Sequence, residues 1–367
     1  MNKNKYFLLS SSTKVVKGIT RSLIIDYLRN ELYFISNEYY DLIQILNRNS
    51  ISLVEEKIDS ESIEDFLDFT SFLLENEIGY LASTLENYPI REEQNDTELV
   101  LLKDVIIDID ELTFSKEIFT ELIAEIDELR CNDIQLRFLS KFKIEFVKEI
   151  LEIINKTDIN YIEIHGTYSE NVIKDDLNDL ILHYSPVSHI YIYSAPKSEI
   201  MDFSIQKEGF YPMHFGKVYF IQYSFNKGKC CGIINKENLS FDSVNNHIDL
   251  EKNNGCLNKK VSIDSSGNIK NCPVMELVHG NLKENNIKEV IKRSTFNKFW
   301  KINKDQIDTC KDCEFRYNCT DCRGFLENPE DLYSKPLKCG YDPKTCTWQD
   351  WSSNPLKQKV INQYGLV

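Results

Sequence analysis

The chain contains the stretch Cys310-Lys-Asp-Cys-Glu-Phe-Arg-Tyr-Asn-Cys-Thr-Asp-Cys-Arg-Gly324, in which five residues separate two Cys-x2-Cys pairs. Upstream, Cys256 is followed by ten residues, Gly267, four residues and Cys272, and downstream the chain has Cys339. Thiolates at such spacings bind soft metal centres. The C-terminal third of the chain is therefore predicted to be a metal or iron–sulfur module.

Zinc and iron–sulfur clusters both use paired cysteines. Two Cys-x2-Cys pairs often form a four-cysteine zinc site. In zinc ribbons, however, the spacer between the two pairs is usually longer than it is in this chain. A four-iron cluster binds four thiolates, and the chain has enough cysteines to approach two such sets. The spacing therefore favours two iron–sulfur clusters, with zinc as the alternative. Seven thiols come from Cys256, Cys272, Cys310, Cys313, Cys319, Cys322 and Cys339, and candidates for an eighth are Cys231, Cys230 and Cys346.

Composition and charge exclude several classes of partner. The chain has 367 residues, which suggests about two or three domains. Its content of 42% hydrophobic and 28% charged residues is typical of an ordinary globular protein. The net charge of −15 indicates an acidic surface that repels phosphates. We therefore expect no nucleic-acid partner and no binding to anionic membranes.

The sequence predicts a cytoplasmic protein. Residues 1–16 are too polar, and their apolar part too short, for a signal peptide. No run approaches the roughly 20 apolar residues that span a bilayer. Since reducing compartments do not favour structural disulfides, clustered cysteines are expected to hold metal.

Residues 1–90 are predicted to form a small winged-helix-like domain. Alternating apolar residues at 22–26 and 32–35 indicate a β-hairpin. Helical spacing follows at 40–46 and again at 63–73.

Residues 98–228 alternate between strand and helix patterns, which predicts βαβ units and a parallel sheet or partial barrel. The last region, 229–367, is rich in Cys, Asn and Lys. It is predicted to hold a short hairpin at 261–269 and a helix around 287–300. In the middle region, strands are expected at 105–109, 134–138, 161–164, 189–193 and 218–221, and helices at 115–130, 141–156 and 170–184. The overall fold class is therefore α/β.

The C-terminal region resembles the SPASM domain, an auxiliary-cluster module found C-terminal to many radical S-adenosylmethionine peptide-modifying enzymes. The similarity lies in the spacing from Cys256 to Cys272 and in Cys310-x2-Cys313-x5-Cys319. The family usually has three residues before the last cysteine of this quartet, and this chain has two. The resemblance implies one cluster on Cys310, Cys313, Cys319 and Cys339, and a second on Cys256, Cys272 and Cys322 with Cys231 as fourth ligand and Cys346 as its rival.

The radical S-adenosylmethionine motif itself is absent from the sequence. Such enzymes carry Cys-x3-Cys-x2-Cys after the first barrel strand, whereas residues 1–229 of this chain contain one cysteine, Cys131. One residue cannot supply three ligands, so no cleavage of S-adenosylmethionine is expected. The middle region is interpreted as a degenerate relative of that barrel, and whether the chain is an enzyme stays open.

Over essentially its full length the chain resembles the SPASM-domain peptide maturases of the grasp-with-spasm systems. This resemblance implies an ATP-grasp ligase and a precursor peptide as partners, in the maturation of a ribosomally made peptide. The shared phrases are Lys17-Gly18 followed by Arg21-Ser22, Asn268-Ile-Lys-Asn-Cys-Pro273, Cys310-Lys-Asp-Cys-Glu-Phe-Arg316 and Lys335-Pro-Leu-Lys-Cys-Gly-Tyr-Asp-Pro343.

The first 90 residues are similar to the leader-peptide recognition element of such pathways. In that mode an extended leader adds a strand to an exposed sheet edge. The alternative is a non-catalytic adaptor that holds the leader while structural zinc or iron–sulfur sites stabilise its C-terminal part. The predicted peptide-binding residues are Leu23, Ile25, Leu32, Phe34, Tyr39, Tyr40 and Ile43.

Overall fold

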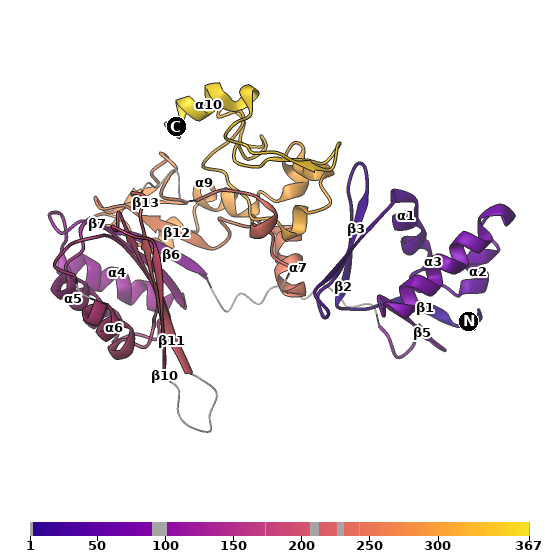
Figure 1. Ribbon diagram of the computed structural model, residues 1–367, viewed down its shortest axis with the longest axis horizontal. Coiled ribbons are helices and arrows are strands. Elements are labelled where there is room, and N and C mark those ends of the chain that lie inside the picture. Colours follow the sequence, from indigo (N-terminus) through magenta and orange to yellow (C-terminus); the bar gives the residue numbers. More distant parts are fainter. Residues whose placement is uncertain are drawn as a thin grey trace. The chain divides into compact units, whose positions relative to one another are not determined.

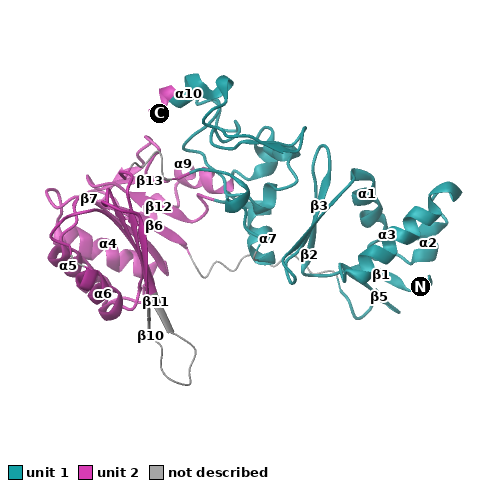
Figure 2. Ribbon diagram, in the orientation of Figure 1, with its two compact units in different colours: residues 1–97, 232–255, 302–361 teal, residues 98–231, 256–301, 362–367 magenta. Residues whose placement is uncertain are grey.

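The computed structural model describes residues 3–89, 101–172, 174–205, 213–225, 231–241 and 243–366 (Figure 1). The chain divides into two compact units (Figure 2). Unit 1 comprises Met1–Thr97, Gly232–Gly255 and Ile302–Ile361, and unit 2 comprises Glu98–Cys231, Cys256–Lys301 and Asn362–Val367. Segment 229–367 thus contributes to both units, and the boundaries expected near residues 90 and 228 stay predictions.

A nine-stranded sheet forms the centre of unit 2, which confirms the predicted α/β class with a large parallel sheet. Its strand order is β10-β11-β9-β8-β7-β6-β12-β13-β14. The strands from β11 to β12 in this order run parallel to one another, and β10, β13 and β14 are antiparallel to their neighbours. The strands are β6 (Asp104–Ile109), β7 (Asp133–Lys141), β8 (Tyr161–Thr167), β9 (Val187–Tyr193), β10 (Glu199–Ile205), β11 (Met213–Ile221), β12 (Lys260–Ile263), β13 (Asn268–Lys270) and β14 (Gly280–Asn281).

Three helices cover one face of this sheet: α4 (Lys116–Glu128), α5 (Ile144–Ile154) and α6 (Lys174–His183) (Figure 1). Their apolar stripes and alternate strand residues form one buried core. Alternation along a strand places every second side chain on the helix-covered face. In β8, for example, Ile162 and Ile164 are buried, whereas Glu163 points to the other face and is half-buried.

The N-terminal part of unit 1 contains the predicted hairpin. Strand β3 (Ser22–Asp26) pairs antiparallel with β2 (Thr13–Lys17) and β4 (Glu31–Ile35), and this gives the order β2-β3-β4. The winged-helix character of this part stays a prediction. The remaining elements are β1 (Tyr6–Leu9), which pairs with β5 (Gly79–Ala82), and helices α1 (Asn37–Leu46), α2 (Ile51–Glu55) and α3 (Ile63–Glu75).

Both faces of β3 are buried, because alternate side chains enter two different cores. Ile24 belongs to a core with residues of α1, α2 and α3. Leu23 and Ile25 belong to a second core, which contains Cys319 and Cys339. The three-stranded sheet and the cysteine-rich segment of unit 1 therefore share one hydrophobic core.

The C-terminal segments have little regular structure. The helix predicted around 287–300 is interrupted: it consists of α8 (Ile287–Val290), α9 (Ser294–Asn297) and a 3-10 turn at Lys298–Lys301. None of the described helices is long and apolar enough to cross a membrane. The other elements are α7 (Val244–Lys252), α10 (Gln358–Gln363), β15 (Tyr341–Asp342), β16 (Thr347–Trp348) and 3-10 turns at Ser60–Ser62, Lys236–Asn238, Lys304–Gln306, Cys310–Asp312, Arg316–Asn318 and Pro355–Lys357.

Candidate functional site

Four of the predicted ligands come together in unit 1, and we call Cys310, Cys313, Cys319 and Cys339 the thiol quartet. Two short 3-10 turns carry the first three, and the N–H of Cys313 donates to the carbonyl of Cys310 at 3.0 Å. Isolated backbone bridges hold the last two, since Cys319 pairs with Leu239 and Cys339 pairs with Ile234. Cys310, Cys319 and Cys339 are less than a tenth exposed, at 8%, 8% and 9%.

Burial and mutual repulsion raise the pKa values of the quartet thiols, and the nearby Lys304 offsets this rise only in part. The pKa of the Cys310 thiol is raised to about 11, mainly by burial, with Lys304 opposing the rise and Asp321 and Cys339 contributing to it. The pKa of Cys319 is raised to about 12, again mainly by burial and against the effect of Lys304. The pKa of Cys313 is also well above its ordinary value, mainly because the thiol is buried. A metal centre stabilises thiolates, so this donor set fits a thiophilic metal group.

The four thiols are not arranged around a single ion. Within the part of the chain that the structure describes, no three His, Cys, Asp or Glu side chains surround one metal-ion position. In a four-iron cluster each cysteine binds its own iron atom.

The other predicted ligands are distributed over both units. Cys322 is buried in unit 1, and Cys346, also in unit 1, is half-buried with its thiol 3.7 Å from the carbonyl oxygen of Pro343. In unit 2, Cys256 and Cys272 are half-buried and Cys231 is exposed. Cys230 lies outside the described residues.

Lys260 of β12 lies beside two of these thiols within unit 2. Burial opposes its charge, but Cys256, Asp104 and Cys272 outweigh this and raise the pKa of Lys260 above its ordinary value. Its Nζ is 3.5 Å from Asp104 Oδ2. This part of unit 2 therefore places a cation close to Cys256 and Cys272.

A buried group of charges lies against the thiol quartet, and the sequence reasoning missed it. Lys304 Nζ donates to Asp321 Oδ1 at 3.0 Å and lies 4.0 Å from Cys310 Sγ. Arg323 Nη2 donates to the same carboxylate oxygen at 2.8 Å. Although burial opposes ionisation, Lys304 and Arg323 hold the pKa of Asp321 at about 2. The only sequence signal is that Asp321 and Arg323 flank Cys322.

The predicted peptide-binding residues fall into two groups. Leu23, Ile25 and Ile43 have no exposed surface and lie in the cores of unit 1. Leu32 and Phe34 of β4 are 37% and 48% exposed. The two tyrosines are half-buried: Tyr39 stacks on Phe69 with ring centroids 4.2 Å apart, and Tyr40 lies 5.2 Å from the Lys17 ammonium.

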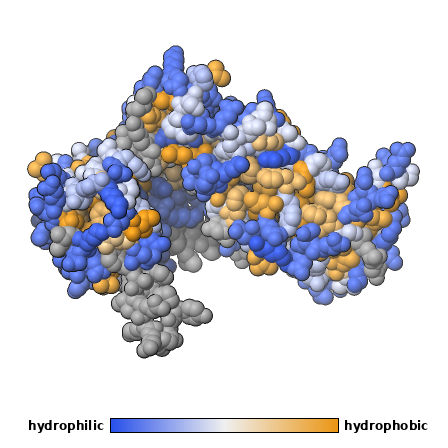
Figure 3. All heavy atoms as spheres, viewed as in Figure 1, coloured by the Kyte–Doolittle hydropathy of each residue, from blue (hydrophilic) through white to orange (hydrophobic). Residues whose placement is uncertain are grey.

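Phe34 also connects the sheet with the quartet. Its ring lies 3.8 Å from the guanidinium of Arg21 and makes an edge contact with Phe315. Arg21 pairs with Glu314, which is only 1% exposed and follows Cys313 in the sequence. In the space-filling view, hydrophobic residues gather over the part of unit 1 where Figure 1 draws β2 and β3 (Figure 3).

The helix-free face of the unit 2 sheet carries polar and aromatic side chains. His165 stacks on Tyr191 with ring centroids 4.7 Å apart, and its Nδ1 is 3.2 Å from Tyr193 Oη. The neighbouring His165 and Gln135 hold the pKa of Glu163 at about 2 in spite of burial. These contacts connect strands β7, β8 and β9 on that face.

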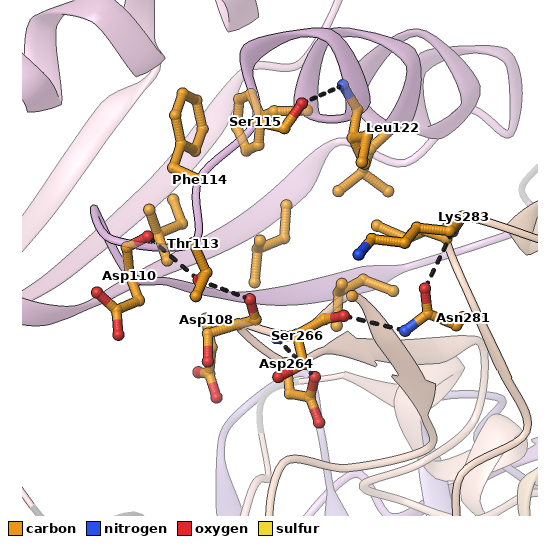
Figure 4. A pocket seen from close by; sticks show the side chains of 18 residues that line it. Asp108, Asp110, Thr113, Phe114, Ser115, Leu122, Asp264, Ser266, Asn281 and Lys283 are labelled. Atoms are coloured by element: carbon orange, nitrogen blue, oxygen red, sulfur yellow. Dashed lines mark hydrogen bonds between the residues drawn. The ribbon is translucent and has the colours of Figure 1, made fainter.

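A cavity of about 250 Å³ lies in unit 2, where β6 and β12 end and α4 begins (Figure 4). Its apolar wall includes Phe119, Leu122 and Ile263. In Figure 4 the amino group of Lys283 points toward the cavity. Ligands of α/β proteins often bind at the carboxyl ends of parallel strands. The cavity is small, and its lining combines apolar side chains with polar ones such as Asp108, Asp264 and Lys283.

Residues 256–314 match the family model described as the SPASM iron–sulfur cluster-binding domain. This confirms the predicted SPASM segment and implies iron–sulfur cluster binding. The matched residues include Cys256, Cys272, Cys310 and Cys313 and belong to both units. No curated protein matches the chain.

Three solved structures of SuiB from Streptococcus suis are similar to the chain, and each comparison covers 90% of this chain and 98% of SuiB. The complex with S-adenosylmethionine is 10% identical with a TM-score of 0.29, and SuiB alone is 9% identical with a TM-score of 0.31. The complex with precursor peptide SuiA is 11% identical with a TM-score of 0.28. These scores are too low to establish the fold or the function of this chain.

Proposed function

We propose that the chain takes part in the maturation of a ribosomally synthesised peptide, as a leader-binding protein that carries iron–sulfur clusters and works with an ATP-grasp ligase. The observation that carries this proposal is the shared core of unit 1. In it Leu23 and Ile25 of the predicted leader-binding sheet pack with Cys319 and Cys339 of the thiol quartet. The SPASM match at residues 256–314 supports the part of the proposal that the chain carries iron–sulfur clusters.

The thiol quartet is the proposed site of the first four-iron cluster. Three buried cysteines and the half-buried Cys313 form a suitable donor set. When bound, such a cluster supplies one-electron transfer or a fixed negative charge. The residues around it would exclude water, because Phe315 and Tyr341 belong to the same core.

The second cluster is proposed from the sequence pattern, with Cys256, Cys272, Cys322 and Cys231 as ligands. Zinc in place of iron is the alternative for both sites. We propose no cleavage of S-adenosylmethionine, because residues 1–229 contain the single cysteine Cys131. That sequence fact also favours a second candidate function, a non-catalytic adaptor that presents the precursor to the ligase.

The leader is proposed to bind along β4. This strand ends the order β2-β3-β4 among the described residues, so an extended peptide can continue the sheet through its outward backbone groups. Leu32 and Phe34 alternate with Tyr33 on β4 and offer exposed apolar surface to the peptide. Leu23, Ile25 and Ile43 would support the sheet from within the two cores.

Leader binding is tested with the full-length protein and a fluorescein-labelled peptide that carries the leader of the candidate precursor. Leu32→Asp places a charge on the proposed binding edge, and we expect it to weaken binding about tenfold or more, or about 1.4 kcal/mol. The matched control is Leu28→Asp, because Leu28 is 74% exposed in the loop between β3 and β4. Equal affinity of the Leu32→Asp variant and the wild type would contradict binding along β4.

Cluster content and catalysis need separate measurements. Anaerobic purification followed by iron and sulfide analysis should show both elements, and zinc without iron would overturn the iron–sulfur assignment. Mass spectrometry of the precursor incubated with the ligase, with and without this chain, separates the two candidate functions. A modification that appears only when the chain is present favours an enzyme, and identical products favour the adaptor.

A further inference from the structure

The buried charges beside the thiol quartet do not balance. Lys304, Asp321 and Arg323 are 4%, 2% and 3% exposed. Two cations and one carboxylate leave one excess positive charge among these three buried side chains. An uncompensated buried charge is strongly unfavourable, so an anionic neighbour is expected.

Asp321 is fully engaged, which leaves the lysine as the source of the excess charge. Arg323 approaches both oxygens of Asp321, with Nη2 2.8 Å from Oδ1 and Nε 2.6 Å from Oδ2. Asn254 Nδ2 donates to Oδ2 at 2.7 Å. Arg323 also donates to the carbonyl oxygens of Leu332 and Ser334 at 2.9 and 2.8 Å.

The lysine faces the quartet. Lys304 Nζ lies 4.0 Å from Cys310 Sγ, while its bond to Asp321 Oδ1 fixes the direction of the side chain. A cluster with four thiolate ligands is an anion, and one-electron reduction makes it more negative. A fixed cation near the ligand sulfur therefore stabilises the reduced form more than the oxidised form.

We propose that Lys304, oriented by Asp321, is the buried counter-charge of the cluster on the thiol quartet and raises its reduction potential. This proposal rests on the iron–sulfur function proposed above. Lys304 acts through the ligand sulfur and the charge of the cluster, so it is a tuning residue and not a catalytic one.

The test is an anaerobic redox titration of the full-length protein, followed by electron paramagnetic resonance. Lys304→Met removes the charge and leaves the Asp321–Arg323 pair intact. We expect the midpoint potential to become more negative, with at least about a tenfold change in the ratio of oxidised to reduced cluster at a given potential, or about 59 mV for one electron. Lys304→Arg keeps the charge and should restore most of the shift.

Two further variants keep the test decisive. Lys304→Gln retains a hydrogen-bond donor for Asp321 without the charge, and serves if Lys304→Met folds poorly. The matched control is Lys311→Met, because Lys311 directly follows Cys310 but its side chain is 51% exposed. Solvent screens that lysine, so we expect no shift in the potential.

The outcomes separate this proposal from the proposed function. If Lys304→Met and Lys304→Gln lose iron and Lys304→Arg keeps it, the result supports the proposal that Lys304 is the counter-charge of the cluster. An intact cluster with an unchanged reduction potential in both Lys304→Met and Lys304→Gln overturns the proposal. Loss of iron from Lys304→Arg together with the other two variants also overturns it. A wild-type protein without iron overturns the iron–sulfur function itself, together with this proposal.

Discussion

Single residues of this chain combine burial with charge, and their pKa values show which charges the fold stabilises. Asp321 and Glu163 are both held ionised, with a pKa of about 2, in spite of burial. Asp321 is held by cations next to the quartet, whereas Glu163 is held by His165 and Gln135 on the unit 2 sheet. In both cases specific partners outweigh desolvation.

Glu163 should make the stability of the protein depend on acid pH. Its pKa is lowered by folding, so the stabilisation is present above the unfolded value of about 4.3 and is lost as the pH falls through the folded value of about 2. Replacement by Gln removes this dependence. We expect wild type to exceed Glu163→Gln in free energy of unfolding by about 1–2 kcal/mol at pH 6, and this difference to shrink as the pH falls to about 2.

Urea unfolding at several pH values measures this difference. Other carboxylates titrate in both proteins and cancel in the comparison. A difference that stays constant from pH 6 to pH 2 would contradict the assignment of the dependence to Glu163.

At the scale of elements, local pattern predicted most of the unit 2 framework. The helices expected at 115–130, 141–156 and 170–184 correspond to α4, α5 and α6, because their apolar spacing is set by neighbouring residues. The helix expected around 287–300 is instead broken after Val290. Pattern alone does not show such interruptions, since tertiary context overrides local helix propensity.

The start of α4 gives a prediction at this scale. Ser115 caps the helix, and its Oγ accepts a hydrogen bond from the N–H of Ile118 at 3.4 Å. Ser115→Ala leaves this N–H without a side-chain partner, and we expect a loss of about 1 kcal/mol in the free energy of unfolding. Ser115→Thr keeps a hydroxyl that can cap the same turn and donate to Glu117, so it is the matched control and should retain wild-type stability in urea unfolding. Equal losses in both variants would show that the cap is not the cause.

At the scale of the molecule, the N-terminal sheet and the quartet share a core within unit 1. Cys319 and Cys339 pack with Leu23 and Ile25 of β3. A metal group bound at the proposed site would organise the thiols, and its binding would then be linked to the stability of the sheet. An isolated 1–90 fragment would expose Leu23 and Ile25, and binding experiments therefore need the whole chain.

This linkage predicts a change far along the sequence when metal is removed. We expect chelation, or the Cys339→Ala substitution, to speed amide hydrogen exchange in 22–26 on the order of tenfold. Peptides from β8 in unit 2 are the internal control and should exchange at unchanged rates. The measurement is hydrogen exchange followed by mass spectrometry, and full protection of 22–26 in the metal-free protein would contradict the linkage.

The sequence by itself determined the local features: the strand and helix periods of 105–221, the hairpin of β3 and β4, and the cysteine pattern that includes the SPASM match at 256–314. These features depend on residues that are close together in the sequence and on the ligand chemistry of cysteine, so the sequence shows them directly. The tertiary structure alone decided that β12 pairs with β6, that Lys304 is buried against Cys310, and that Leu23 shares a core with Cys339. The strand pairing and the shared core join segments distant in sequence. Lys304 and Cys310 are only six residues apart, but their burial also depends on the segments packed around them. All three arrangements form because packing of the whole unit removes these residues from water.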